Sequence, residues 1–131
     1  MTGLDTNVLV RYIAQDDEKQ SARAAELMEA LTPEAPGFVS MVALIELVWV
    51  LQSCYASPKT EIINVVNVLL KTKALVLENA ETIQQALGVF SKNNVEFADC
   101  LIQRSGQRAG CRHTVSFDDK ASKMDGMYFM G

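Results

Sequence analysis

Four acidic residues occupy sequence positions where a solvent-exposed surface charge is not expected: Asp5, Glu46, Asp99 and Asp118. Asp5 and Asp118 each directly follow a predicted strand, and Asp99 falls in the first turn of a predicted helix. Glu46 is the only charged residue of the apolar stretch 38–51. Because open parallel α/β sheets bind ligands outside the carboxyl ends of their strands, we expect these acids to gather in one crevice.

Carboxylates that share a crevice repel each other, so either some of them stay protonated or a cation joins them. Mg²⁺ and Mn²⁺ prefer carboxylate and water oxygens. One histidine, His113, which we expect to be structural, and three scattered cysteines cannot build a zinc site rich in nitrogen and sulfur. An all-oxygen metal site suits phosphodiester hydrolysis, because the metal polarises the phosphate and helps ionise an attacking water.

Each acid also has a structural alternative when it is taken singly. Asp99 at the start of a helix is a favourable partner of the helix dipole, and Glu46 can pair with a buried arginine. All four acids occupy positions compatible with one crevice, which favours a metal site over four separate structural roles.

Apolar residues at helical spacing alternate with short apolar runs along the chain. Helices are predicted over 6–13, 17–31, 41–53, from Pro58, over 82–90 and 97–109, and strands over 1–4, 37–39, 74–77, 113–117 and 128–129. This alternation predicts an α/β fold in which helices cover both faces of a parallel sheet. The helix over 41–53 is apolar nearly all round, so we expect it to be buried, with Trp49 in the core.

Length and composition indicate one globular domain over residues 1–131. Hydrophobic residues make up 49% of the chain and the net charge is −4, so any contact with nucleic acid is local or made through metal. Three cysteines without a C-x-x-C pair and the absence of a signal peptide predict a cytoplasmic protein. The longest apolar stretch is too short to cross a membrane.

Four ordered blocks of the sequence carry a resemblance to a known family. They are LDTNVLVRY at 4–12, SMVALIE at 40–46, EFADCLI at 96–102 and SFD at 116–118. Together they resemble the PIN-domain family, and especially its VapC-type toxins of bacterial toxin–antitoxin pairs. The blocks span nearly the whole chain in the expected order.

The resemblance implies a three-layer α/β/α sandwich around a central parallel sheet, and a Mg²⁺- or Mn²⁺-dependent endoribonuclease. It implies that the metal-binding and catalytic acids are Asp5, Glu46, Asp99 and Asp118, and that Thr6, Asn7 and Ser116 support them. It further implies an RNA substrate, a homodimer and inhibition by a cognate antitoxin. We expect Asp119 to be peripheral and regard Arg11 as the best candidate for a contact with RNA phosphate.

Two alternatives remain open at this point. One is a degenerate PIN domain that only binds RNA or a partner, which the complete set of four acids argues against. The other is a receiver-like α/β module with an acidic pocket, which leaves Glu46 unexplained.

Overall fold

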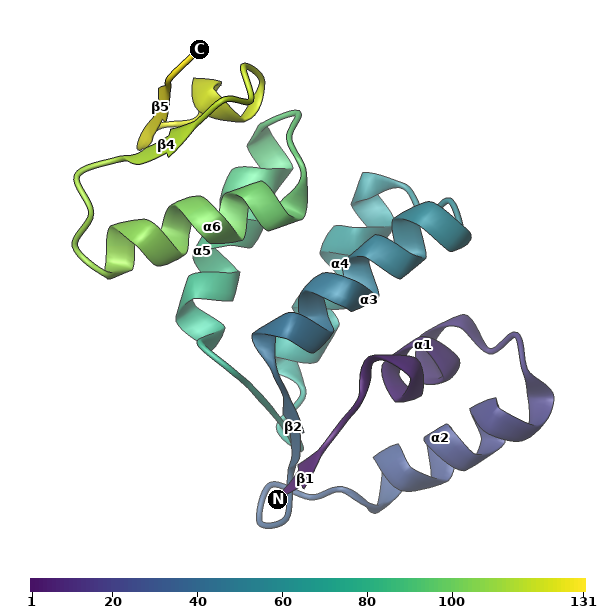
Figure 1. Ribbon diagram of the computed structural model, residues 1–131. Coiled ribbons are helices and arrows are strands. Elements are labelled where there is room, and N and C mark those ends of the chain that lie inside the picture. Colours follow the sequence, from purple (N-terminus) through teal and green to yellow (C-terminus); the bar gives the residue numbers. More distant parts are fainter. The chain divides into compact units, whose positions relative to one another are not determined.

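The computed structural model describes all 131 residues and divides into two compact units, residues 1–80 and 81–131, each described here by itself. The first unit contains β1 (Thr2–Gly3), α1 (Thr6–Ala14), α2 (Glu18–Ala30), β2 (Gly37–Val39), α3 (Met41–Cys54), α4 (Lys59–Lys71) and β3 (Leu75–Leu77) (Figure 1). The second contains α5 (Ala80–Lys92), which begins at the boundary, α6 (Phe97–Arg108), β4 (Thr114–Ser116), the 3₁₀ turn η1 (Ala121–Lys123) and β5 (Met127–Phe129).

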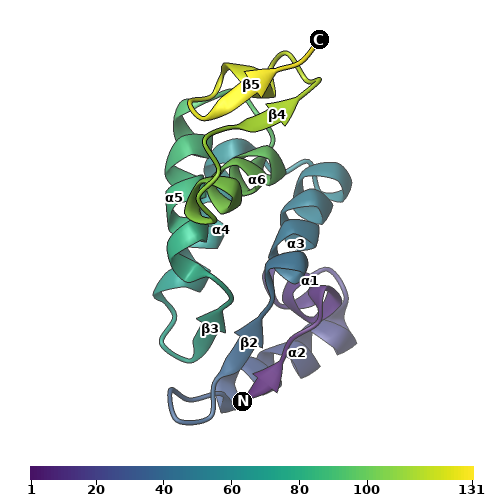
Figure 2. The same ribbon diagram turned by 60° about the vertical axis from the view of Figure 1, so that its left-hand side comes forward.

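The three strands of the first unit form a parallel sheet with β2 in the middle (Figure 2). Parallel neighbours need a crossover connection, and a helix pair supplies each one: α1 and α2 join β1 to β2, and α3 and α4 join β2 to β3. The carboxyl ends of β1 and β2 are therefore both followed by a helix N-terminus. Asp5 caps α1, and Ser40 caps α3 by accepting a hydrogen bond from the amide of Ala43 at 3.1 Å.

Gly37 in the central strand lets the apolar side chains of the first unit close around β2. A Cβ at this position would lie 2.8 Å from Leu31, 2.9 Å from Leu4 and 3.0 Å from Leu75. Any side chain there would force these leucines apart. The core of this unit continues through α1, α3 and α4, where Leu9, Leu44, Leu47, Ile62 and Val66 are fully buried.

One face of α3 is open, contrary to the sequence prediction of a fully buried helix. Val42, Glu46 and Trp49 follow one another at helical spacing, and the side chains of Val42 and Trp49 are 67% and 63% exposed. The prediction that Trp49 is a core residue is wrong. A helix that is apolar nearly all round carries no periodicity from which to choose its buried face. The single charge, Glu46, marks the outer face.

Packing in the second unit rests on α5 and α6, which lie side by side (Figures 1 and 2). Phe90 and Phe97 meet edge to face, with ring centroids 5.5 Å apart and an interplanar angle of 76°. The thiol of Cys100 contacts the sulfur of Met124 at 3.9 Å, which ties η1 to the helices. β4 and β5 pair in parallel, with Thr114 opposite Met127.

Six helices and parallel strands confirm the predicted α/β fold. The strands are divided between a three-stranded sheet in the first unit and a two-stranded sheet in the second. Most helix bounds lie within one or two residues of the prediction, and the strand at Gly37–Val39 has the predicted bounds. No helix has the length and apolar character needed to cross a membrane.

Candidate active site

Asp5 is held at the end of β1 by its role as the N-cap of α1. Its backbone is extended, and its Oδ1 accepts a hydrogen bond of 2.8 Å from the amide of Thr6. A carboxylate in this position also lies at the positive end of the helix dipole. The cap fixes the acid at the carboxyl end of the strand, where the sequence predicted it.

Thr6 connects Asp5 to the second predicted acid. Its amide donates to Asp5, and its hydroxyl donates to Oε1 of Glu46 on α3 at 3.0 Å. Two residues 41 positions apart in the chain are therefore joined through one side chain and its own backbone. Thr6 orients both carboxylates through these two hydrogen bonds.

Asp5, Thr6, Asn7 and Glu46 line one cavity of the first unit, with a volume of about 420 Å³. Both carboxylates are exposed, so a ligand in this cavity reaches them directly. Asn7 directly follows Thr6 in α1 and adds a polar amide to the lining. Every residue of the first unit that the sequence assigned to the site thus lies on this one cavity.

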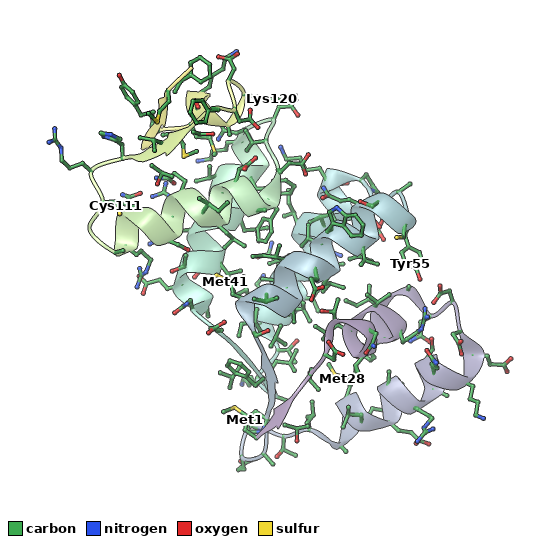
Figure 3. All side chains as sticks on the ribbon, viewed as in Figure 1. Met1, Met28, Met41, Tyr55, Cys111 and Lys120 are labelled. Carbon is green, nitrogen blue, oxygen red and sulfur yellow. The ribbon has the colours of Figure 1, made fainter.

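Arg11 borders the same cavity, and its guanidinium already has partners. Its Nε donates to Gln20 at 2.7 Å, and its Nη1 pairs with Asp16 at 3.1 Å. Tyr55, labelled in Figure 3 at the C-terminal end of α3, donates its hydroxyl to Asp16. This hydrogen bond is the main cause that holds the pKa of Asp16 below its usual range. Arg11 therefore belongs to a polar cluster at the rim.

Asp99 is the acid of the second unit whose pKa is shifted from its ordinary value. It lies partly buried in the first turn of α6. Burial raises the pKa of its carboxyl, and the negative charges of Asp118 and Glu96 raise it further, against a backbone hydrogen bond at Glu96 that lowers it. The structure therefore brings Asp99 and Asp118 close enough for one charge to act on the other.

Asp118 is held by the turn that follows β4. Its Oδ1 accepts a hydrogen bond from the amide of Ala121 at 3.1 Å, and its own amide donates to Oγ of Ser116 at 2.9 Å. Ser116 fixes the backbone on one side of the acid, while η1 fixes it on the other.

Glu96 is an acid that the sequence interpretation quoted but did not assign to the site. It is the N-cap of α6, three residues before Asp99, and its charge contributes to the raised pKa of Asp99. The signal that identifies it is the helical spacing, since residues three apart share one face.

The chemistry of these side chains fits a hard divalent cation. Each unit supplies a pair of carboxylates with hydroxyl groups beside them, and these oxygens are the ligands that Mg²⁺ and Mn²⁺ prefer. Within either unit, no three or more His, Cys, Asp and Glu side chains gather as a metal-binding group. His113 stacks on Tyr128 instead, with ring centroids 5.2 Å apart.

Comparison with known proteins places this arrangement in a family. A family model described as "PIN domain" matches residues 4–127, a range that begins just before Asp5 and ends after Asp118. The chain belongs to the PIN-domain family. It is also similar to a protein named "VapC ribonuclease" from Aquifex aeolicus (strain VF5), with 29% identity over 122 residues, 92% of this chain and 90% of the relative.

The residues that the family model matches include the whole candidate site. All four acids fall within the matched residues, as do Thr6, Asn7 and Ser116. The match also covers β2 to β4 and all six helices, so it runs through both units.

Proposed function

We propose that this PIN-domain protein is a metal-dependent endoribonuclease that hydrolyses phosphodiester bonds of RNA. Family membership and the similarity to a protein named VapC ribonuclease support this activity. The observation that supports the proposed activity most directly is a pair of hydrogen bonds from Thr6. They go to Asp5 and to Glu46 and hold both carboxylates on one cavity.

The proposed metal-binding and catalytic acids are Asp5, Glu46, Asp99 and Asp118. Their all-carboxylate character favours Mg²⁺ or Mn²⁺ over zinc. When bound, such an ion neutralises phosphate charge and lowers the pKa of a water molecule. The chain itself orients the ligands: the Thr6 hydroxyl positions Glu46, and Ser116 holds the backbone of Asp118.

We also propose that residues 1–131 act as one PIN domain, because the family match runs through both units. The resemblance of the four sequence blocks to VapC-type toxins supports a role as the toxin of a type II pair, with a cognate antitoxin and a homodimeric state. An arginine of the antitoxin can pair with carboxylates in two parallel hydrogen bonds and so compete with the metal. Co-expression with the product of the adjacent gene tests this partner.

Cleavage of RNA with and without a divalent ion tests the activity. Purified protein is incubated with a mixed single-stranded and structured RNA in Mg²⁺ or Mn²⁺, and again in EDTA. We expect cleavage only with the ion, and we expect Asp5→Asn to remove it, because the substitution removes a ligand charge.

Glu34→Gln is the matched control. Glu34 is an exposed acid of the loop between α2 and β2, outside the cavity of Asp5, so its neutralisation changes net charge equally and leaves cleavage intact. Cleavage that persists in excess chelator would contradict the metal mechanism. A well-folded protein that binds RNA and cleaves none of it would favour the degenerate, binding-only PIN domain.

A further inference from the structure

The second unit carries a cleft that contains none of the four proposed catalytic acids. It has a volume of about 540 Å³ and lies between α5, α6 and the segment around η1, which begins near Lys120, labelled in Figure 3. Its lining includes Lys92, Arg104 and Lys123 as cations and Asp125 as the single acid. The local charge is therefore positive on a chain whose net charge is −4.

The partners that these cations have within the protein are weak or incomplete. Lys123 lies 3.9 Å from Asp119, and both side chains are more than 70% exposed, so this ion pair contributes little. Arg104 donates from Nη1 to Gln107 at 2.6 Å, which orients the guanidinium, while its buried Nε has no hydrogen-bond partner. A buried donor without an acceptor is costly, and a ligand oxygen would satisfy it.

Gly88 keeps this cleft open. It lies within α5, where glycine lowers helix stability relative to alanine, and it lines the cleft. A Cβ built on Gly88 meets nothing within 4 Å, so packing does not require the glycine. Its missing side chain leaves space in the lining of the cleft.

We propose that this cleft binds phosphate, and that its source is the backbone of the RNA substrate. Three cations in one concave site match the charge of a phosphodiester backbone, and arginine adds planar donors suited to phosphate oxygens. The volume exceeds what one phosphate needs and admits nucleotide-sized ligands. The RNA assignment rests on the proposed ribonuclease function, whereas the phosphate chemistry does not.

Binding of a fluorescein-labelled single-stranded RNA in EDTA tests the cleft without cleavage. Fluorescence anisotropy is measured over a series of salt concentrations for wild type and for the triple variant Lys92→Gln/Arg104→Gln/Lys123→Gln. Each phosphate contact with a single strand contributes about 0.7 to the slope of log K against log salt, so we expect the slope to fall by about two. Lys71→Gln, which neutralises an exposed lysine of α4, should leave the slope unchanged.

Gly88→Gln tests the same cleft without a change of charge. Glutamine favours a helix more than glycine does, so the variant should fold, while its side chain occupies the cleft. We expect weaker RNA binding from this variant as well. A triple variant with the wild-type slope, or a wild type that does not bind RNA at all, would overturn the proposal.

A test with inorganic phosphate distinguishes a cleft that binds the RNA backbone from one that binds free phosphate. If phosphate raises the melting temperature of wild type at constant ionic strength and not that of the triple variant, while RNA binding is equal in both, the cleft is a free-anion site and the RNA assignment is wrong. Cleavage in Mg²⁺ is scored separately. Loss of RNA binding through the cleft in a protein that never cleaves would refute the ribonuclease and not the phosphate site.

Discussion

In the first unit, Thr6 donates hydrogen bonds to both acids, Asp5 and Glu46. In the second unit, the charge of Asp118 instead acts on Asp99 as a like charge. Asp5 and Glu46 each accept a hydrogen bond from Thr6, at 2.8 and 3.0 Å. Asp99 is partly buried, and its carboxyl is influenced by the charges of Asp118 and Glu96, with burial as the largest cause of its raised pKa.

These two arrangements would favour the binding of a cation in different ways. Donors that hold the carboxylates in advance reduce the ordering that a bound ion must impose. Like charges in a partly buried place store repulsion, which a cation relieves on binding. For the proposed metal binding, the pair Asp5 and Glu46 therefore supplies ligands of fixed geometry, whereas the pair Asp99 and Asp118 supplies stored repulsion that a cation would relieve.

The largest expected effect is the loss of cleavage when either pair is broken. Glu46→Gln and Asp99→Asn should each lower the initial rate of RNA cleavage in saturating Mg²⁺ by about 100-fold or more, the scale seen when one charge-stabilising group is removed. The reason is the same for both, since each substitution removes the negative charge of a proposed metal ligand while keeping the size of the side chain.

Asp119→Asn is the control for this comparison. Asp119 is adjacent to Asp118 and makes only a long, exposed contact with Lys123 at 3.9 Å, so its neutralisation should leave the rate within about twofold of wild type. If Glu46→Gln behaves like Asp119→Asn while Asp99→Asn is inactive, Glu46 is not part of the catalytic site.

A smaller effect is expected from the residues that support each pair. Thr6→Val removes the hydroxyl that orients Glu46 and keeps a β-branched shape, so cleavage should fall by about 10–100-fold, as for other residues that orient metal ligands. Thr6→Ser should restore most of the rate, because the hydroxyl returns. Initial rates at several Mg²⁺ concentrations separate weaker metal binding from slower chemistry.

Ser116→Ala is the counterpart in the second unit. Ser116 accepts from the backbone of Asp118, and Ala121 still donates to the Asp118 carboxylate after the substitution. The loss should therefore be smaller than for Thr6→Val. Equal losses for Thr6→Val, Thr6→Ser and Ser116→Ala would show that these positions act through general destabilisation.

The contacts of Thr6 also show which parts of the site were accessible to sequence reasoning. The four acids were predicted from local signals: Asp5 and Asp118 follow a strand, Glu46 interrupts an apolar stretch, and Asp99 lies in the first turn of a helix. The Thr6–Glu46 hydrogen bond was not predicted, because it depends on how α3 is rotated about its axis. Periodicity reports that rotation only when polar residues mark one face, and α3 has a single charge.

The exposure of Trp49 and the pairing of the strands were also beyond the reach of local sequence patterns. Aromatic residues are usually buried, but Trp49 follows Glu46 by one helical turn and shares its open face. The positions of the strands were predicted well, because short apolar runs between helices identify them. Their division into sheets of three and two was not, since strand pairing is a long-range property that no local pattern encodes.

The smallest expected effect is a stability change in metal-free protein when Asp99 is neutralised. The folded-state pKa of Asp99 is raised, so the folded chain binds more protons than the unfolded chain between the two pKa values. Its stability must then fall as the pH rises through this window, and the penalty is fully present above the folded pKa. In EDTA at neutral pH, Asp99→Asn should therefore melt at or slightly above wild type, by less than about 1 kcal/mol because the group is screened by solvent. The difference should vanish below the ordinary pKa of aspartate.

Glu46→Gln is the control for this stability change. It keeps an acceptor for Thr6 and should show no comparable rise in melting temperature. An Asp99→Asn variant that melts well below wild type at neutral pH would instead identify Asp99 as a structural acid at the start of α6, where a carboxylate stabilises the helix by about 0.3–1 kcal/mol.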